Sequence, residues 1–369
     1  MTTLDRVLLA GGGTAGHVSP LLATAEEITR RHPEAVVTAV GSPGGLEERL
    51  VPERGFALAF VPKVAFPRRP NGAALRFPAA FRGALREADR LVETHRPQVI
   101  VGFGGYVSTP MYLAARKAGV PFVIHEQNAR PGLANKLGAR WAEHVAVTFP
   151  STPMKDAEIV GMPLRREITE IKPAMLRAEG LEYFGLAPGR PTVLVTGGSL
   201  GAVSLNDAFR ARVEQLTDAG IQILHVTGRG KGFEVPERTT GARYVVVEYV
   251  DRMDLAYSVA DLVVTRSGAG MVSELTTVGL PAVYVPLPIG NGEQKLNSRD
   301  VVAAGGGIVV DNDDFTPAWI DENLVPLVRD EERLSAMRRA AAGQGHADAA
   351  GKLVDLVEDA SSKAKGTGA

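Results

Sequence analysis

The chain has 369 residues, with 41 Lys and Arg against 42 Asp and Glu, and it contains no cysteine. The net charge of −1 argues against a dedicated nucleic-acid-binding protein, and the lack of cysteine excludes disulfides and thiolate metal sites. No stretch approaches the roughly 20 apolar residues that span a bilayer, and the N-terminus lacks a basic region followed by an apolar core. We therefore expect a protein that is neither secreted nor integral, long enough for two domains.

Two glycine-rich loops are the most informative feature of the chain. Residues 11–17 follow the apolar run Val7–Ala10, and residues 197–202 follow the run Val193–Thr196. Glycines let the backbone turn sharply, and a helix that starts just after such a turn presents N–H groups to an anion. The pattern predicts two phosphate-binding loops in two tandem α/β domains, with the ligand between the domains. The alternative is a pair of ordinary strand-to-helix turns.

Apolar runs alternate with helix-like stretches along both halves, which predicts two parallel sheets flanked by helices. After the first run, the predicted strands of the N-terminal half are residues 35–40, 99–101, 121–124, 145–147 and 159–160. Those of the C-terminal half are residues 192–195, 221–226, 244–247, 262–264, 282–285 and 308–310. We place the hinge near Gly161. This predicts an N-terminal domain of residues 1–162, joined by a C-terminal helix 346–360, and a C-terminal domain of residues 163–345.

Helical spacing of apolar residues continues from 331 to 342 and from 348 to 359, and residues 361–369 are expected to form a frayed tail.

In the first half, His17 ends the first glycine loop, at or just before a helix start marked by Ser19 and Pro20. A histidine there can act as a general base near neutral pH, or it can merely cap the helix or bind an anion.

Polar residues also follow other predicted strands, and the carboxyl ends of parallel strands are where open α/β sheets bind ligands. The segment 125–128 follows the strand 121–124, and the glycine-rich segment 102–106 follows the strand ending at Val101. In the second half, residues 265–274 offer small residues for a phosphate and then the carboxylate of Glu274, which can accept hydrogen bonds from a ribose. This combination suggests a nucleoside diphosphate.

Amides in the segment 288–297 suit sugar hydroxyls, which need both donors and acceptors. The segment 311–314 contains an Asp-x-Asp that could hold a divalent ion, although a turn followed by a helix cap at Thr316 is the favoured interpretation. Without a His-x-x-x-His pair or cysteine, metal catalysis has little support.

The segment 63–90 combines seven basic residues with only Glu87 and Asp89, and phenylalanines lie between them. Basic residues beside aromatic rings suit an interfacial contact with an anionic membrane. The apolar residues from Leu75 to Leu85 also fall near a helical period, so a solvated helix with its rings in the core is the alternative.

The segments 12–17, 125–128, 197–202 and 266–274 closely resemble the MurG family in order and spacing, across nearly the whole chain. This is the family of bacterial transferases that move N-acetylglucosamine from its UDP conjugate to undecaprenyl-diphospho-muramoyl-pentapeptide. The resemblance implies the GT-B fold of two Rossmann-like α/β domains and an inverting transfer. The C4 hydroxyl of the muramic acid attacks the anomeric carbon, UDP leaves, and neither a cofactor nor a metal is required.

The resemblance also implies which residues bind the donor. The diphosphate is expected at Ser199 and along Gly268, Ala269, Gly270, Met271, Val272 and Ser273. Glu274 is expected to bind the ribose, Val250 the uracil and Gln294 the sugar hydroxyls. From the N-terminal half, Thr14, Ala15, Gly16 and Asn128 are expected to approach the sugar, and Arg165, just past the hinge, is expected to reach the donor. His17 is the expected general base and Glu126 a weaker candidate.

The acceptor and the membrane are expected at the N-terminal domain, at Tyr106, Arg68, Arg69, Phe77, Phe81 and Arg82. The resemblance implies a peripheral enzyme on the cytoplasmic face of the bacterial cell membrane. It would act in peptidoglycan synthesis, with cell-wall synthesis or division proteins as further partners and no nucleic acid. Two departures stand out: Ala15 replaces a glycine of many relatives, and Glu293 precedes Gln294 where some relatives carry two glutamines.

Three alternatives remain at this point. A UDP-N-acetylglucosamine 2-epimerase shares the fold and the donor but needs no basic aromatic membrane face. A nicotinamide-dependent dehydrogenase expects an acidic residue at the end of the second strand, and residues 39–42 offer none. A sugar-binding protein without catalytic activity would ordinarily carry a secretion signal.

Overall fold

The computed structural model describes residues 3–65, 72–198, 201–236, 241–288 and 292–366, excluding the side chains of 72–75 and 364–366. Contacts divide the chain into two units. Unit 1 comprises residues 1–165 and 348–369, and unit 2 comprises residues 166–347. Each unit is built on one parallel sheet, so the predicted α/β class with two Rossmann-like sheets is confirmed.

The sheet of unit 1 has the strand order β3-β2-β1-β4-β5-β6-β7. Its strands are β1 (Arg6–Gly11), β2 (Val36–Gly41), β3 (Ala57–Phe60), β4 (Val99–Gly104), β5 (Phe122–Glu126), β6 (His144–Val147) and β7 (Glu158–Ile159). The central strands are buried along nearly their whole length, as expected for a parallel sheet covered on both faces. Sequence patterns missed β3, a four-residue edge strand that is only partly buried.

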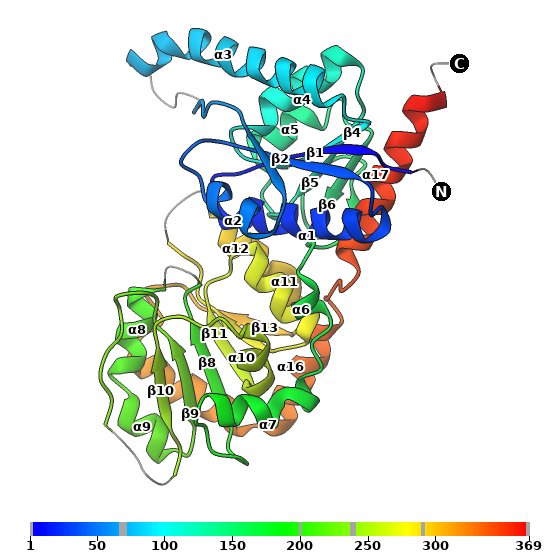
Figure 1. Ribbon diagram of the computed structural model, residues 1–369. Helices are drawn as coiled ribbons and strands as arrows, with labels where there is room; N and C mark the ends of the chain where they lie inside the picture. Colours follow the sequence, from blue (N-terminus) through cyan, green and yellow to red (C-terminus); the bar gives the residue numbers. More distant parts are fainter. Residues whose placement is uncertain (1–2, 66–71, 199–200, 237–240, 289–291, 367–369) are drawn as a thin grey trace. The chain divides into compact units, whose positions relative to one another are not determined.

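Helices cover both faces of this sheet (Figure 1). One face carries α1 (Ala15–Arg31), α2 (Glu47–Glu53) and α17 (Ala349–Gly366), and the other carries α3 (Gly72–His95) and α4 (Ser108–Ala118). The short helix α5 (Leu133–Gly138) packs beside α4. Two separate apolar cores result, one on each face of the sheet.

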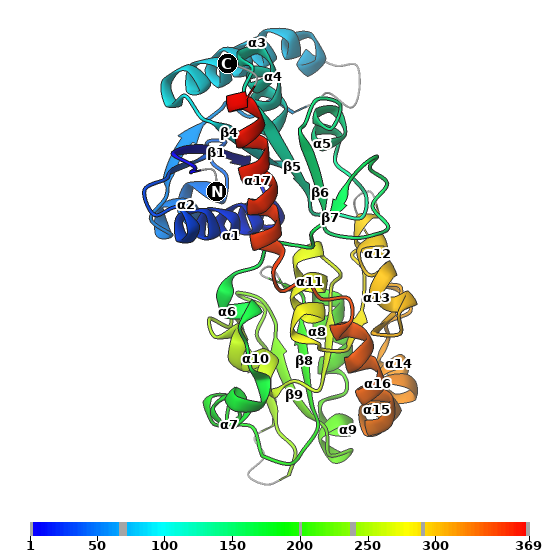
Figure 2. The same ribbon diagram turned by 90° about the vertical axis from the view of Figure 1, so that its right-hand side faces the viewer.

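The C-terminal helix α17 belongs to unit 1 and lies along α1 (Figure 2). Arg31 of α1 donates to Asp355 at 2.6 Å, and His32 Nε2 lies 2.9 Å from Glu358. The helix continues through Gly366, and Ser361 is 1% exposed. The predicted frayed tail is therefore wrong for residues 361–366, because α17 packs on the sheet of unit 1 along most of its length. Residues 367–369 lie outside the described part.

The sheet of unit 2 has the order β10-β9-β8-β11-β12-β13. Its strands are β8 (Thr192–Thr196), β9 (Gln222–Val226), β10 (Tyr244–Val247), β11 (Leu262–Thr265), β12 (Ala282–Tyr284) and β13 (Gly307–Val309). The strand β8 has the central place in this sheet that β1 has in unit 1. The second glycine loop therefore follows a buried central strand, as the first does.

One face of this second sheet packs against α8 (Val203–Arg210), α9 (Val213–Asp218), η1 (Ile320–Leu324), α15 (Val325–Arg329) and α16 (Glu331–Ala342). The helices α10 (Met253–Val259) and α11 (Ala269–Val278) lie on the other face (Figure 1). The remaining helices of unit 2 are α6 (Arg166–Thr169), α7 (Pro173–Tyr183), α12 (Glu293–Asn297), α13 (Arg299–Ala303) and α14 (Pro317–Trp319). The loops before α8 and α11 thus lie at the carboxyl ends of neighbouring central strands, β8 and β11.

Candidate active site

The first glycine loop joins β1 to α1 with an irregular turn. The register of β1 against β4 shifts between Ala10 and Gly11, and Gly13 has φ 86°. A bulge at a strand end redirects the chain, and a positive φ favours glycine. The helix begins at Ala15 rather than near Ser19, and Pro20 lies inside it. His17 is consequently a first-turn residue of α1, and the predicted helix start was too late.

The imidazole of His17 is oriented by the loop that precedes it. Nδ1 lies 3.1 Å from the carbonyl oxygen of Gly12 and 3.1 Å from Oγ1 of Thr14. A carbonyl only accepts, so Nδ1 donates in the tautomer that makes this bond and the lone pair is on Nε2. Within the described residues, Nε2 makes no hydrogen bond. It points at Gly104, where an added Cβ would lie 3.2 Å away.

Burial lowers the pKa of His17 below its ordinary value, and the hydrogen bond to Gly12 and the charge of Glu47 partly oppose this. The imidazole is therefore neutral at pH 7, with Nε2 able to accept a proton. This geometry suits the predicted general base.

The segment 125–128 is arranged differently from the expectation. The strand β5 continues through Glu126, two residues beyond the predicted strand 121–124, so His125 and Glu126 are buried strand residues. Glu126 accepts hydrogen bonds from the N–H groups of Asn128 and Gly132, both at 3.0 Å, and from Nδ2 of Asn135 at 2.9 Å. Burial raises its pKa. Its carboxylate holds its own loop, which favours a structural role over proton transfer.

His125 is fully buried, with Nε2 2.8 Å from the carbonyl oxygen of Gly161. Burial lowers its pKa to about 4. The unfolded chain takes up this proton below about pH 6.5, whereas the folded chain does so only below about pH 4. His125 therefore makes the protein less stable as the pH falls through this window.

We expect the free energy of unfolding of wild type to lose about 2 kcal/mol between pH 7 and pH 5 through His125 alone. Urea unfolding at the two pH values measures this loss. In the variant His125→Gln, which has no titrating ring, the pH dependence should be smaller by that amount. An unchanged pH dependence would contradict the assignment.

A pocket of about 300 Å³ lies beside the first glycine loop. It is lined by Gly12, Gly13, Ser42, Pro43, Gly44, Gly45, Leu46, Arg49, Lys63 and Tyr106. The ammonium of Lys63 lies 5.3 Å from the centre of the Tyr106 ring, which is 43% exposed. Two cations and a glycine-rich wall suit an anionic ligand.

In unit 2, the second glycine loop turns into α8 as predicted. Gly198 and Gly201 both have positive φ, and a Cβ at Gly201 would overlap the backbone of Thr227. Ser199 lies outside the described residues. Gly201 is therefore packed tightly against the residue that follows β9, and glycine is required there for space as well as for φ.

The helix α11 begins directly after β11, with Gly268 at its N-cap. Its first residues, from Ala269 to Glu274, are the ones expected to surround the diphosphate and the ribose. The hydroxyl of Tyr257, on α10, donates to Oε2 of Glu274 at 2.6 Å and also lies 3.5 Å from Sδ of Met271. Tyr257 was missed by sequence analysis, because its pattern is that of an ordinary core residue of α10.

Arg266 precedes this helix. The sequence analysis included it in the segment 265–274 but gave it no role of its own. Its guanidinium donates to the carbonyl oxygens of Val285 and Pro286 and to Oγ of Ser204, at 2.9, 3.2 and 2.8 Å. Burial lowers its pKa. No acidic side chain of the described residues pairs with it, so its positive charge lies between the end of β12 and Ser204, on a residue that precedes the N-cap of α11 by two positions.

Three further residues that were predicted to bind the donor lie in different parts of the chain. Val250 is 7% exposed, in the loop after β10. Oε1 of Gln294 accepts a hydrogen bond from the N–H of Leu287 at 3.0 Å. Arg165 is the last residue of the first segment of unit 1 and is partly exposed. This hydrogen bond links Gln294, at the start of α12, to the segment that follows β12.

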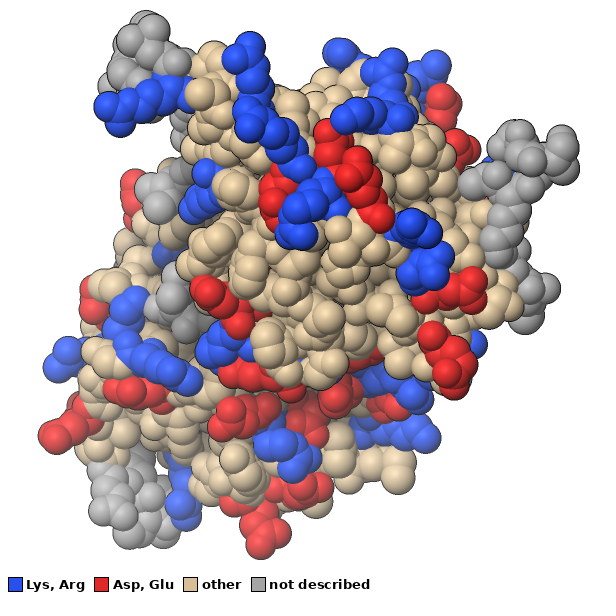
Figure 3. Space-filling model, turned by 45° about the horizontal axis from the view of Figure 1, so that its top comes forward, with Lys and Arg blue, Asp and Glu red and all other residues tan. Residues whose placement is uncertain are grey.

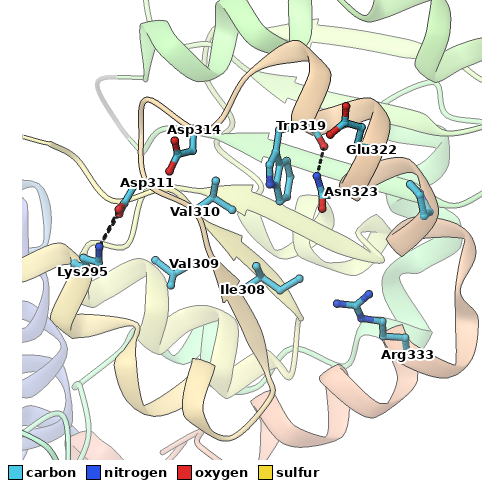
Figure 4. A pocket seen from close by; sticks show the side chains of 11 residues that line it. Lys295, Ile308, Val309, Val310, Asp311, Asp314, Trp319, Glu322, Asn323 and Arg333 are labelled. Carbon is cyan, nitrogen blue, oxygen red and sulfur yellow. Dashed lines mark hydrogen bonds and ion pairs between the residues drawn. The ribbon is translucent and has the colours of Figure 1, made fainter.

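A second pocket, of about 550 Å³, lies at the β13 edge of unit 2 (Figure 4). Lys295 pairs with Asp311 at 2.8 Å on one side of it. Oγ1 of Thr316 accepts from the N–H of Trp319 at 3.2 Å, which confirms the predicted helix cap. Within the described residues, no group of three or more His, Asp or Glu side chains is placed to hold a metal ion.

Residues 72–90 of the basic segment lie in α3, and the two halves of this helix differ. Ala84, Ala88, Leu91 and Val92 pack in the core, whereas Phe77 and Phe81 are half-exposed outside it, with ring centres 5.4 Å apart. Arg76, Arg82 and Arg86 are exposed. The space-filling view shows Lys and Arg side chains on this face, with acidic side chains among them (Figure 3). Arg68 and Arg69 lie outside the described residues.

Arg90 and Lys117 are two cations of this region that have acidic partners, Glu87 and Asp89. Among the described helices, none is long and apolar enough to cross a membrane.

Comparison with known proteins identifies the relatives. Residues 7–147 match the glycosyltransferase family 28 N-terminal domain, and residues 192–353 match the C-terminal domain of the same family. The chain is 52% identical to a protein of a Nocardioides species over 95% of this chain and 97% of the relative. It is 54% identical to a protein of Clavibacter sepedonicus over 96% of both. Both are named UDP-N-acetylglucosamine--N-acetylmuramyl-(pentapeptide) pyrophosphoryl-undecaprenol N-acetylglucosamine transferase.

Solved structures agree with these relatives. The crystal structure of Acinetobacter baumannii MurG superposes with a TM-score of 0.79 at 29% identity, covering 96% of this chain and 99% of that one. The calicheamicin glycosyltransferase CalG4 superposes with a TM-score of 0.62 at 20% identity, covering 96% and 98%, and shows the fold alone.

Proposed function

The chain belongs to the MurG family within glycosyltransferase family 28, and from this premise we propose how its residues carry out the reaction of that family. The protein is a hexosyltransferase. It moves N-acetylglucosamine from UDP-N-acetylglucosamine to the C4 hydroxyl of the muramic acid in undecaprenyl-diphospho-muramoyl-pentapeptide, a step of peptidoglycan synthesis. The observation that carries the mechanism is that Nε2 of His17, in the first turn of α1, makes no hydrogen bond within the described residues.

In the proposed reaction, Nε2 of His17 accepts the proton of the C4 hydroxyl. The hydroxyl oxygen forms a bond to the anomeric carbon from the face opposite to UDP, so the configuration inverts. The bond from the anomeric carbon to the phosphate oxygen breaks, and UDP leaves with the electron pair. A positioned base contributes about 10²- to 10⁴-fold to such a step.

The leaving diphosphate gains negative charge as this bond breaks. We place it at the N-terminus of α11, where the first N–H groups after Gly268 have no partner further back in the helix. Arg266 adds a fixed positive charge nearby. Donors that are already oriented stabilise such a charge without reorganisation. This arrangement supports catalysis without a metal ion.

The acceptor carries its own diphosphate, and we place this group in the pocket beside the first glycine loop. Arg49 and Lys63 supply the charge, and Tyr106 supplies a hydroxyl and an exposed ring. Thr14, at the N-cap of α1, and Ala15 and Gly16, in its first turn, would face the sugars. The two glycine loops thus have different ligands in this proposal, the acceptor in unit 1 and the donor UDP in unit 2.

The direct test is transfer of labelled N-acetylglucosamine from its UDP conjugate to a lipid-linked muramoyl-pentapeptide, with and without a chelator. We expect one labelled product, formed at the same rate in both conditions. Conversion of the donor without acceptor would instead favour a 2-epimerase. Loss of transfer with the chelator would contradict the metal-free mechanism.

We also propose that the protein works as a peripheral enzyme on the cytoplasmic face of the cell membrane, where its lipid-linked acceptor is held. The exposed part of α3 supports this, because aromatic rings favour an anionic interface together with arginines that have no acidic partner among the described residues. Proteins of cell-wall synthesis or division are further proposed partners.

Replacing Arg76, Arg82 and Arg86 with glutamine is expected to weaken binding to anionic vesicles by about 10- to 100-fold, since each basic residue near such a surface contributes about 1 kcal/mol. Sedimentation with phosphatidylglycerol vesicles measures the change. The matched control is the double variant Arg90→Gln and Lys117→Gln, which removes cations that already have acidic partners. An equal loss in both variants would show a dependence on net charge rather than a contact through α3.

A further inference from the structure

Glu47 is a buried carboxylate that the proposed mechanism does not use. It is the first residue of α2 and is 1% exposed. Oε1 accepts a hydrogen bond from the N–H of Ser42, and Oε2 accepts one from the N–H of Gly13, both at 2.9 Å. A Cβ at Gly12, Gly41 or Gly45 would overlap its side chain. Three glycines therefore leave room for this carboxylate beside the first glycine loop.

The hydrogen bond to Gly13 reaches His17 through a single peptide unit. The peptide between Gly12 and Gly13 donates its N–H to Glu47, and its carbonyl oxygen accepts from Nδ1 of His17. A peptide whose N–H is bonded to an anion has a more negative carbonyl oxygen, because hydrogen bonds in a chain polarise one another. A stronger acceptor at Gly12 favours the tautomer with the proton on Nδ1 and the lone pair on Nε2.

We propose that Glu47 is a positioning residue that holds His17 in its reactive tautomer through the Gly12–Gly13 peptide. A continuous chain of hydrogen bonds runs from the carboxylate through the peptide to the imidazole. It ends at Nε2, which makes no hydrogen bond within the described residues. A carboxylate bonded directly to a histidine has the same effect in other enzymes, where it orients the ring and stabilises the imidazolium that forms. Here the peptide lies between the two groups. The proposal rests on the proposed role of His17 as the general base.

The same contact changes what the first glycine loop can bind. The N–H of Gly13 was expected to face a phosphate, but it is already bonded to Glu47. The amides of Ala15 and Gly16, in the first turn of α1, make no hydrogen bond within the described residues and remain available to a ligand. Glu47 thus orders the loop before any ligand arrives.

The charged groups around His17 come from three elements. Glu47 approaches from α2, and Arg49 of the same helix and Lys63 line the pocket that Gly12 and Gly13 also line. A Cβ at Gly104 would lie 3.2 Å from Nε2 of His17 and 3.4 Å from Nδ2 of Asn135, and this Nδ2 donates to the carboxylate of Glu126. Burial lowers the pKa of His17, and the charge of Glu47 raises it. Removal of that charge should therefore move the protonation of His17 to lower pH.

The test is Glu47→Gln, which keeps the size of the side chain and removes its charge. We expect kcat to fall about 10- to 100-fold, by analogy with the loss when the hydrogen-bond partner that orients a metal-binding histidine is removed. KM for the donor should stay within about twofold, and the acidic limb of the kcat profile should move to lower pH. The matched control is Glu48→Gln, because Glu48 bonds the N–H of Gly44 and does not reach the Gly12–Gly13 peptide. The control should leave the acidic limb in place.

Two readouts separate positioning from simple support of the fold. ¹⁵N NMR of wild type should show His17 with the proton on Nδ1, and Glu47→Gln should show a mixture of tautomers. In the double variant with His17→Ala, the change at Glu47 should have almost no further effect on kcat, because residues that act as a unit are not additive.

Multiplicative losses in the double variant, or a wild-type imidazole with its proton on Nε2, would overturn the inference. The wild-type spectrum decides this even if the Glu47 variant fails to fold. A different outcome would separate the two proposals. If His17→Ala is active while Glu47→Gln shows the expected tautomer shift, His17 is not the general base, but the chain of hydrogen bonds from Glu47 to His17 is confirmed.

Discussion

His17→Ala should lower kcat by about 10²- to 10⁴-fold, the usual contribution of a general base, and should leave KM for the donor nearly unchanged. The loss follows from the position of Nε2, which has a free lone pair in a neutral ring. The donor is bound mainly by residues of unit 2 in our proposal, so its affinity should not depend on this ring. Steady-state transfer with the lipid-linked acceptor measures both constants.

The control for this change is His95→Ala, which removes a histidine from the last turn of α3, away from the first glycine loop. Its kcat should equal that of wild type. Comparable kcat values for the His17 variant and wild type would mean that another group accepts the proton. Glu126 would be a poor replacement, because its oxygens already accept three hydrogen bonds.

Glu274→Ala should raise KM for the donor by about 10- to 100-fold, since a hydrogen bond to a charged group contributes about 1.5–3 kcal/mol. Tyr257 holds this carboxylate at 2.6 Å, so its orientation is set before the ribose arrives. The chemical step takes place elsewhere on the donor, so kcat should change much less than KM. Competition between UDP-N-acetylglucosamine and its 2′-deoxyribose analogue shows whether the ribose is the partner.

Wild type should discriminate against the deoxy analogue, and Glu274→Ala should lose this discrimination. The variant Tyr257→Phe keeps the carboxylate but removes its partner, and it should show a smaller increase in KM. Equal discrimination in wild type and Glu274→Ala would assign the ribose contact to another residue. Such a result would leave the transfer reaction itself unaffected.

Several parts of the site could be predicted because they depend on neighbours along the chain. Apolar runs followed by glycine-rich loops identified β1, β8 and the helices after them, since strand and turn preferences are local. The Thr316 cap was predicted for the same reason. The short edge strand β3 was missed because it lacks a fully buried run.

The errors fall where distant contacts override local patterns. His125 and Glu126 look like residues of a polar loop, but β5 carries them into the core, where Gly161, Asn135 and nearby backbone amides satisfy them. Tyr257 and Arg266 resemble an ordinary core residue and an ordinary cation. Only their packing against α11 and the end of β12 shows what they orient.

By itself, the sequence determined the two parallel-sheet units, the positions of both glycine loops, and the family to which the chain belongs. Short-range periodicity and motif spacing are sufficient for these conclusions. Only the tertiary structure showed that Glu47 bonds the first loop, 34 residues away in the chain, and that one peptide links it to His17. Hydrogen bonds between segments that are distant in sequence depend on how the strands are ordered in the sheet. No local pattern in either segment encodes that order.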